Sequence, residues 1–445
     1  MIMEAQERIK TTAVKGTDTA RQVRALVKSI YRNAHEAKAQ GQKVAYFMVA
    51  SQYDEILRAM DIVPLPTENY AGLCAAKRDM DRFLLKAEAE GYSQVLCSYA
   101  RIGLGFDSLR KELGGIPENA PDGGMPAPDM MLGSSAVCDP RFKWYQAAGR
   151  YLEVPTYSID VVGPPVYTDL SEVRDYYIRY QKEQLQGLVS FLEAQTGRKM
   201  DGERLWEAIR LGDEAWRLWY EVDRLRTAAP CPMPTQDHFS VMVAGHFYAG
   251  TQTAVDFYQG LYDEVKYKAD HKIGVIPAEK HRILYGGGLP PWHTLWIFNW
   301  FESFGAVFVI ENVYRAYDPV EVPHHVKDPV EYLAWRAFLR FTQRHEKARA
   351  NSGNPTVERL LGMIDDYRID GVVFHACRSC RATTIGQVHI KNILSQFTDI
   401  PKMQLVSDMV DLRDYSEAQW KAQIGAFIES LSARTASTAE GRKKS

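Results

Sequence analysis

Short apolar runs alternate with longer amphipathic segments through the first third of this chain. The runs are rich in β-branched and aromatic side chains, and they predict extended segments at residues 43–51, 62–69, 93–100, 130–137 and 154–161. Apolar side chains at helical spacing predict helices up to about residue 40 and at residues 53–60, 75–90 and 140–152. This alternation predicts a parallel sheet covered by helices.

Residues 168–275 have a different pattern, with apolar side chains three or four positions apart and a helix cap at Thr168 or Asp169. The first pattern then returns and predicts strands at residues 282–288, 306–313, 370–376 and 403–411. We therefore predict an α/β fold with two Rossmann- or flavodoxin-like parallel sheets and a helical section between them or attached to the second. The expected boundaries are residues 1–165, 166–432 and a disordered tail at 433–445.

The composition excludes several classes of protein. The 445 residues are 46% hydrophobic and 25% charged, which is typical of globular proteins. Lys and Arg total 54 against 56 Asp and Glu, so no basic excess indicates nucleic-acid binding. Six cysteines are too few for a disulfide scaffold, and the polar N-terminus lacks the apolar core of a signal peptide. We expect a cytoplasmic protein that binds neither nucleic acid nor membrane.

Several cysteines follow predicted strands. Cys97 ends one apolar run, Cys138 follows another, and Cys377 and Cys380 follow the run at 370–376. Ligands of open α/β sheets bind beyond the carboxyl ends of the strands, so these thiols could meet between the two units. Thiolates bind iron–sulfur clusters and soft metals. The alternative is that each is a small buried apolar residue, as free cysteines often are.

Acidic residues occur at the same predicted edge. Glu68 lies in the turn-rich end of the second extended segment, where it could be a helix-start carboxylate or a substrate-side acid or base. Asp408 and Asp411 are interpreted as turn or cap residues. Trp292 and the two tryptophans four and eight positions later share one helical face, which indicates core or a subunit interface, with an aromatic wall for an acyl group as the alternative.

Nucleotide-binding motifs are absent from the sequence. No phosphate-binding loop of the G-x-x-x-x-G-K-[ST] type occurs, so ATP, if it is used, would be bound by another chain. The glycines at 286–288 do not complete a dinucleotide-binding fingerprint. We expect them to allow close approach of backbone or ligand instead.

Four segments together resemble one known family, in order and spacing over nearly the whole chain. They are Leu-Cys-Ser-Tyr at 96–99, Met-Pro-Ala-Pro-Asp-Met at 125–130, Pro-Pro-Trp at 290–292 and Ser-Cys-Arg-Ala-Thr-Thr-Ile-Gly-Gln at 379–387. The chain is identified by them as similar to the benzoyl-CoA reductase / 2-hydroxyacyl-CoA dehydratase family. The resemblance implies two α/β domains with a [4Fe–4S] cluster between them, bound by Cys97, Cys138 and Cys380. Cys377 departs from the family pattern.

The second and fourth segments look closest to a cluster-bearing subunit of ATP-dependent benzoyl-CoA reductase. This implies reduction of benzoyl-CoA, or a close analogue, to a cyclic dienoyl-CoA by low-potential single electrons. The implied partners are a related second catalytic subunit, an ATP-hydrolysing iron–sulfur activator and ferredoxin as electron donor. One alternative is a 2-hydroxyacyl-CoA dehydratase subunit that works through a ketyl radical, and another is a non-catalytic cluster-bearing scaffold.

Overall fold

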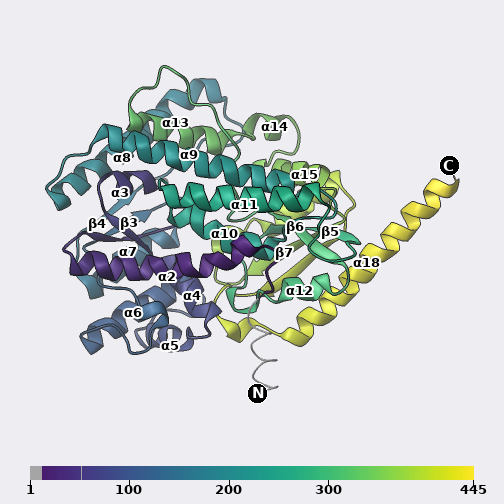
Figure 1. The fold of residues 1–445 in the computed structure, drawn as a ribbon, viewed down its shortest axis with the longest axis horizontal. Coiled ribbons are helices and arrows are strands. Elements are labelled where there is room, and N and C mark those ends of the chain that lie inside the picture. The colour runs from purple at the N-terminus through teal and green to yellow at the C-terminus, as the bar shows by residue number, and fades with distance from the viewer. Residues whose placement is uncertain (1–12, 52, 445) are drawn as a thin grey trace.

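Two separate four-stranded parallel sheets organise the protein (Figure 1). The computed structural model describes residues 13–51 and 53–444. The N-terminal sheet has the strand order β2-β1-β3-β4, with β1 at Val44–Phe47, β2 at Val63–Pro66, β3 at Met130–Ser134 and β4 at Thr156–Ile159. The C-terminal sheet has the order β6-β5-β7-β8, with β5 at His281–Gly287, β6 at Ala306–Glu311, β7 at Gly371–Cys377 and β8 at Lys402–Ser407. The predicted fold class is confirmed.

Burial explains why the strands read as unbroken apolar runs. Every residue of β1, β3, β6 and β7 is buried, because helices cover both faces of each sheet. The helices of the N-terminal unit are α2 (Asp18–Ala39), α3 (Asp54–Ala59), α4 (Thr67–Ala76), α5 (Asp81–Ala89), α6 (Ser98–Leu113) and α7 (Pro140–Leu152).

The helical section forms a layer that reaches from one sheet to the other. It consists of α8 (Leu170–Thr196), α9 (Gly202–Leu225), α10 (Thr235–Phe247) and α11 (Gln252–Asp270). Asp169 caps α8, where its side chain accepts a hydrogen bond from the Ser171 N–H at 2.9 Å. In Figure 1, α9 and α11 extend from the region of β3 and β4 toward the region of β5 and β6.

The remaining helices follow later in the chain: α12 (Ile297–Glu302), α13 (Pro329–Thr342), α14 (His345–Ala350), α15 (Pro355–Asp366), α16 (Arg381–Thr384), α17 (Gln387–Phe397) and α18 (Glu417–Lys444). The first half of helix α18 packs in the core beside the C-terminal sheet through Trp420, Ile424 and Phe427, and its C-terminal part extends away from the rest of the chain (Figure 1). Its backbone is helical through most of the tail for which disorder was expected, since Ala, Glu, Lys and Arg favour helix. The domain boundaries stay predictions.

The expected strand at residues 93–100 does not form. The Leu96 N–H donates to the Ser93 carbonyl at 3.0 Å in a turn, Val95 is 72% exposed, and α6 begins at Ser98. An apolar run of only three residues buries too little surface for an inner strand, and the helical spacing after it determines the local structure. Cys97 is therefore the N-cap residue of a helix rather than a strand end.

Both sheets share one topological feature that places a ligand site. The chain leaves β1 toward β2 on one side and later returns to β3 on the other, and β5 is flanked by β6 and β7 in the same way. Ligands of such sheets bind in the crevice where this reversal occurs, at the carboxyl ends of the strands.

Among the described residues, no helix combines the length and apolar character that a membrane span requires.

Candidate active site

A cavity of about 210 Å³ lies where the two crevices meet. Its wall includes Ala50 after β1, Cys138 after β3, Leu289 after β5 and Cys380 after β7. The carboxyl ends of the central strands of both sheets thus face one space. We refer to it as the cysteine cavity, because Cys97 also lines it.

The three predicted cysteine ligands line this one cavity from three different elements. Cys97 comes from the start of α6, Cys138 from the loop before α7 and Cys380 from the start of α16. All three are free thiols. Their sulfur atoms do not all lie within 4.8 Å of one another. Thiolates of one tetrahedral zinc ion, at about 2.3 Å from the metal, would be closer than that.

Burial raises the pKa values of these three thiols and so keeps them neutral. It raises the pKa of Cys138 from the ordinary 9.0 to about 12, although Arg141 opposes the shift. Burial also raises the pKa values of Cys97 and Cys380. A neutral buried thiol is a poor nucleophile, whereas a coordinated thiol is deprotonated by its metal. Neutral thiols of this kind are not poised as catalytic nucleophiles, and their role as cluster ligands stays a prediction.

A hydrogen-bond relay joins the segments that carry two of the cysteines. The Ser98 N–H donates to Ser379 Oγ at 3.1 Å, and the Ser379 hydroxyl donates in turn to the Asp408 carboxylate. Ser98 follows Cys97 and Ser379 precedes Cys380, so this contact between serines 281 positions apart brings the two cysteine-bearing segments together. All three relay residues are buried.

Asp408 is itself held by a turn, as its position after β8 predicts. Its Oδ1 accepts hydrogen bonds from the Val410 N–H at 2.9 Å and the Asp411 N–H at 3.0 Å. Asp411 caps the short 3-10 helix Leu412–Asp414 and forms an ion pair with the buried Arg101 at 3.1 Å. These aspartates fix local backbone, and neither lines the cysteine cavity.

The segment 379–387 positions Cys380 through contacts with β7. Thr384 Oγ1 donates to the Cys377 carbonyl at 2.8 Å, and Gln387 Nε2 donates to the His375 carbonyl at 3.1 Å. Cys377 is fully buried, with its Sγ 3.8 Å from Asp408 Oδ2, and it is not part of the cavity wall. The family resemblance names Cys380 rather than Cys377 as a ligand, and Cys380 is also the one of the two that lines the cavity.

Glu68 also lines the cysteine cavity. It lies in the first turn of α4, where its Oε2 accepts the Val49 N–H at 2.8 Å and faces Arg141 Nη2 at 3.3 Å. Arg141 belongs to α7 and also donates to the Ala136 carbonyl at 2.7 Å, next to the loop of Cys138. Glu68 thus links β1, α4 and α7, and its role as acid or base stays a prediction.

The cavity wall contains strained backbone. Ala50 (φ 54°), Val137 (φ 76°) and Tyr314 (φ 51°) all adopt the left-handed region that favours glycine. For a β-branched residue such as Val137 this conformation is unusual and costs on the order of 1–3 kcal/mol. Strain of this kind persists where the surrounding structure holds a functional geometry.

The glycines at 286–288 allow a close backbone approach, as expected. A Cβ atom on Gly288 would lie 1.8 Å from the His375 carbonyl oxygen, and the residue has a φ of 95°.

The three tryptophans at 292, 296 and 300 do not share one environment, because the single helix expected there divides into a 3-10 turn and α12. Trp292 donates to the Tyr99 hydroxyl beside the cavity, whereas Trp296 and Trp300 flank Lys421 of α18.

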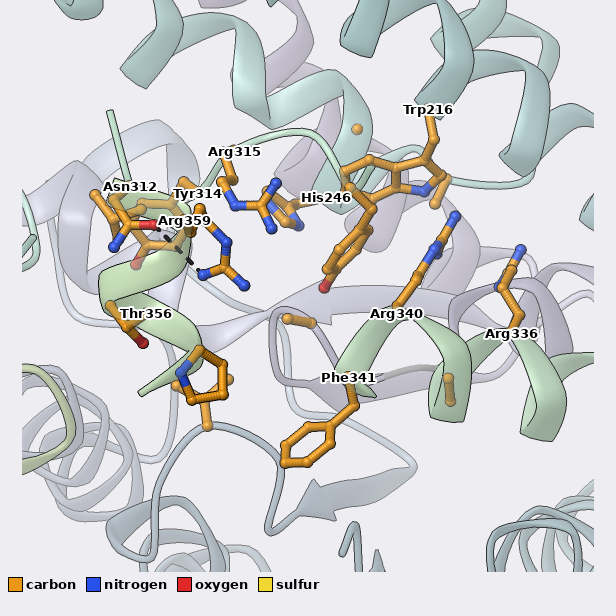
Figure 2. Close-up of a pocket in the computed structure, with 18 of the residues that line it drawn as sticks. Trp216, His246, Asn312, Tyr314, Arg315, Arg336, Arg340, Phe341, Thr356 and Arg359 are labelled. Carbon is orange, nitrogen blue, oxygen red and sulfur yellow. Dashed lines mark hydrogen bonds between the residues drawn. The ribbon is translucent and has the colours of Figure 1, made fainter. Parts of the chain in front are cut away.

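A larger pocket of about 750 Å³ adjoins the cysteine cavity (Figure 2). We call it the arginine pocket, because Arg315, Arg336, Arg340 and Arg359 line it. Sequence reasoning missed it, since these residues come from one loop and two separate helices and form no local motif.

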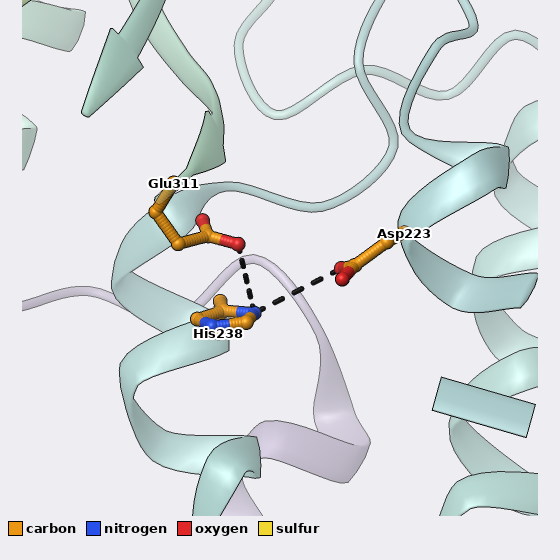
Figure 3. Close-up of side chains that lie close together, drawn as sticks. All are labelled: Asp223, His238 and Glu311. Carbon is orange, nitrogen blue, oxygen red and sulfur yellow. Dashed lines mark ion pairs between the residues drawn. The ribbon is translucent and has the colours of Figure 1, made fainter. Parts of the chain in front are cut away.

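Asp223, His238 and Glu311 form a buried group of side chains that lie close together (Figure 3). His238 Nδ1 is 2.9 Å from Glu311 Oε1, and its Nε2 is 2.9 Å from the Tyr314 carbonyl oxygen. Because a carbonyl oxygen only accepts, His238 Nε2 donates this bond and ties the group to the Tyr314 backbone.

The same group contains its own cation. Arg226 binds both oxygens of Glu311 at 2.7 Å and Asp223 at 3.0 Å. Burial disfavours the ionised Glu311, but Arg226 and His238 outweigh it and hold the pKa of that carboxyl well below its usual range. The group is a charge-compensated network that holds the strained Tyr314 backbone, and it needs no metal ion.

Known proteins similar to this chain are subunits of acyl-CoA dehydratases and of a benzoyl-CoA reductase. A family model described as 2-hydroxyglutaryl-CoA dehydratase, D-component, matches residues 52–431. The alpha subunit of (R)-2-hydroxyisocaproyl-CoA dehydratase from Clostridioides difficile is 27% identical, with 91% of this chain and 94% of that protein covered. The alpha subunit of (R)-phenyllactyl-CoA dehydratase from Clostridium sporogenes is 26% identical, with coverages of 90% and 92%. One of the subunits of benzoyl-CoA reductase from Thauera aromatica is 25% identical, with coverages of 88% and 89%.

Proposed function

Because the chain belongs to the family of the 2-hydroxyglutaryl-CoA dehydratase D-component, we propose that it is the cluster-bearing catalytic subunit of an enzyme that reduces an aromatic acyl-CoA. The family resemblance inferred from the sequence is confirmed by the match over residues 52–431. The observation that carries the proposal is the meeting of Cys97, Cys138 and Cys380 in one cavity with Glu68.

The residues of the cysteine cavity fit a [4Fe–4S] cluster. Three free thiols line one space, with Cys380 buried and Cys97 and Cys138 half-buried, and thiolates are the usual ligands of such a cluster. We propose that Cys97, Cys138 and Cys380 hold the cluster, with no fourth cysteine in the described cavity wall. When bound, such a cluster supplies single electrons at low potential.

The protein's own contribution is to orient groups and to exclude water. Ser379 and Asp408 fix the position of the Cys380 loop, and Arg141 fixes Glu68. Tyr99 contributes to a cavity wall that is mainly apolar, which keeps water away from reactive species. In this proposal Glu68 holds or transfers a proton at its carboxyl group, within the wall that the acyl group would contact.

Two reactions suit this site. Ring reduction is favoured by the sequence of residues 125–130 and 379–387, which resembles a benzoyl-CoA reductase subunit. Dehydration of a 2-hydroxyacyl-CoA is the second candidate, because relatives of similar identity are named as dehydratase alpha subunits. Both reactions place an acyl thioester beside the three cysteines. They differ in their electron balance, since reduction consumes electrons with every product and dehydration returns them.

We further propose that the chain works in a hetero-oligomer. The relatives from the dehydratases and from the reductase are each named as one subunit of an enzyme, which supports a related second catalytic subunit. The absence of a phosphate-binding loop in the sequence supports a separate ATP-hydrolysing iron–sulfur activator, with ferredoxin as the electron donor.

The test is an anaerobic analysis of the assembled complex. Iron and sulfide content is measured first, and electrons consumed are then compared with product formed from benzoyl-CoA. Stoichiometric electron consumption supports the reductase. Catalytic amounts of electrons with a 2-hydroxyacyl-CoA, and no turnover of benzoyl-CoA, would assign the chain to the dehydratases instead. A fully loaded complex that turns over neither substrate would refute the proposal.

A further inference from the structure

The arginine pocket contains more positive than negative charge. Arg336 is neutralised by Glu55 at 2.6 Å and Asp213 at 2.8 Å, but among the described residues Arg340 forms an ion pair only with the same Asp213, at 3.5 Å. Asp318 likewise divides its charge between two guanidinium groups, those of Arg315 and Arg344. Asp54 also lines the pocket, and its pKa is raised to about 7 by burial and by Glu55.

Arg359 has no ion pair within the described ranges 13–51 and 53–444. Its hydrogen bond goes to the neutral Asn312 Oδ1 at 3.4 Å, and its Nε has no partner there. Burial and the nearby Arg315 and Arg344 lower the pKa of this guanidinium well below its usual value. Arg359 is half-buried, and a cation withdrawn from water without a counterion is unfavourable unless something else supplies the negative charge.

The guanidinium groups converge on one space. In Figure 2, Arg315 and Arg359 extend into the pocket from one side, and Arg336 and Arg340 rise from α13 on the other. Residues at the N-terminus of the twelve-residue helix α15, including Thr356, line the same pocket. A helix N-terminus adds positive potential and so favours an anion at the same place.

The arginine pocket is continuous with the cysteine cavity. Ala50, Val137, His246 and Tyr314 line both. Burial lowers the pKa of His246 to about 3, so the ring is neutral, and its Nε2 has no hydrogen-bond partner among the described residues. A ligand that extends from one space to the other would pass this unpartnered polar group.

We propose that the arginine pocket binds the phosphate groups of the CoA part of the substrate, with Arg359 as the residue that distinguishes CoA from phosphate-free thiols. The proposal rests on the proposed function, which places the acyl group in the cysteine cavity. An acyl-CoA has one apolar end and one polyanionic end, and the two adjoining spaces have the matching characters. Arg359 acts on binding here and has no part in the chemistry.

The test compares two probes on the cluster-loaded complex. Dissociation constants are measured by titration calorimetry for CoA and for pantetheine, which lacks the phosphates. A charge-assisted hydrogen bond corresponds to a change of about 10- to 100-fold in affinity. Arg359→Gln should weaken CoA binding by that factor and leave pantetheine binding within about twofold, whereas Arg359→Lys should retain part of the affinity.

Two controls separate binding from folding. Arg210→Gln removes an exposed arginine of α9 that already pairs with Glu207 at 2.6 Å, and it should change neither constant. Without ligand, Arg359→Gln should melt at or above the wild-type temperature, because it removes a half-buried charge that has no ion pair among the described residues. CoA should raise the melting temperature of the wild type more than that of the variant.

The outcomes distinguish this inference from the proposed function. Equal weakening of CoA and pantetheine, or unchanged CoA affinity, in Arg359→Gln would overturn the inference. Pyrophosphate binding to the wild type as tightly as CoA would show a general anion site and would also overturn it. A loaded complex that binds CoA through Arg359 but turns over no acyl-CoA would support the phosphate site while refuting the proposed function.

Discussion

Ser379→Ala removes the centre of the relay that joins the Cys97 and Cys380 segments. The buried Ser98 N–H then loses its acceptor at 3.1 Å, and Asp408 loses one donor. An orphaned buried donor costs about 1–3 kcal/mol and a hydrogen bond to a charged group contributes about 1.5–3 kcal/mol, so we expect a loss of about 2–5 kcal/mol. A typical domain is stable by about 5–15 kcal/mol, so the variant should fold.

The loss should be local and should therefore affect retention of the cluster. Weakening the relay by about 2 kcal/mol or more raises the population of locally opened molecules about 30-fold or more. We expect the iron of Ser379→Ala to pass to a chelator faster than wild-type iron by at least that factor, under anaerobic conditions. Unfolding of the cluster-free protein provides a second measurement, because the relay exists without the cluster.

Two controls make this prediction sharp. Ser379→Thr keeps the hydroxyl and should restore most of the retention. Ser303→Ala removes an exposed hydroxyl that bonds the Trp300 carbonyl at 2.6 Å on a different helix, and it should release iron at the wild-type rate. Iron release from Ser379→Ala at the wild-type rate, with unchanged unfolding, would refute the assignment of the relay as the element that positions the two thiols.

Three further predictions concern the cavity itself. Cys380→Ala should abolish cluster content by iron analysis, whereas Cys377→Ala should retain most of it because that thiol does not face the cavity; the reverse result would show that the register is wrong. Glu68→Gln should keep the iron and reduce turnover roughly 100-fold, and unchanged turnover would leave Glu68 a structural residue. Alkylation of Cys138 in the cluster-free protein should still increase above pH 9, because burial raises its pKa to about 12, and a plateau near pH 9 in peptide mass spectrometry would contradict this. The same raised pKa means that its contribution to stability is full below about pH 9 and is lost as the pH rises toward 12.

Local patterns were sufficient to predict much of the fold. The helix expected at 140–152 forms at Pro140–Leu152, since a proline at its first turn and apolar spacing specify it within thirteen residues. The ends of β3 and β7 were predicted from their apolar runs, and this placed Cys138 and Cys380 at the carboxyl ends of strands. Cys97 was correctly expected near the other two cysteines, but the strand predicted to carry it was wrong. A short apolar run before a helix resembles the end of a strand.

Features built from distant residues were not predictable in this way. Asp408 was correctly interpreted as a turn residue, but its bond to Ser379 depends on how β7 and β8 pair. Arg315, Arg340 and Arg359 meet only after a loop and two helices have packed, and each alone resembles an ordinary surface arginine in the sequence. Contacts of this kind cannot be predicted from the spacing of residues along the chain.

The division of the cysteine cavity between two sheets has a consequence for the order of events during synthesis. Cys97 and Cys138 leave the ribosome early, with the strands of the N-terminal sheet, whereas Cys380 follows only after the helical layer and three strands of the C-terminal sheet. A nascent chain can therefore present two thiols long before the third exists. Any group that all three bind must be inserted late, and a ribosome-bound chain stalled before β7 would expose an unfinished pair of thiols to oxidants and stray metal ions.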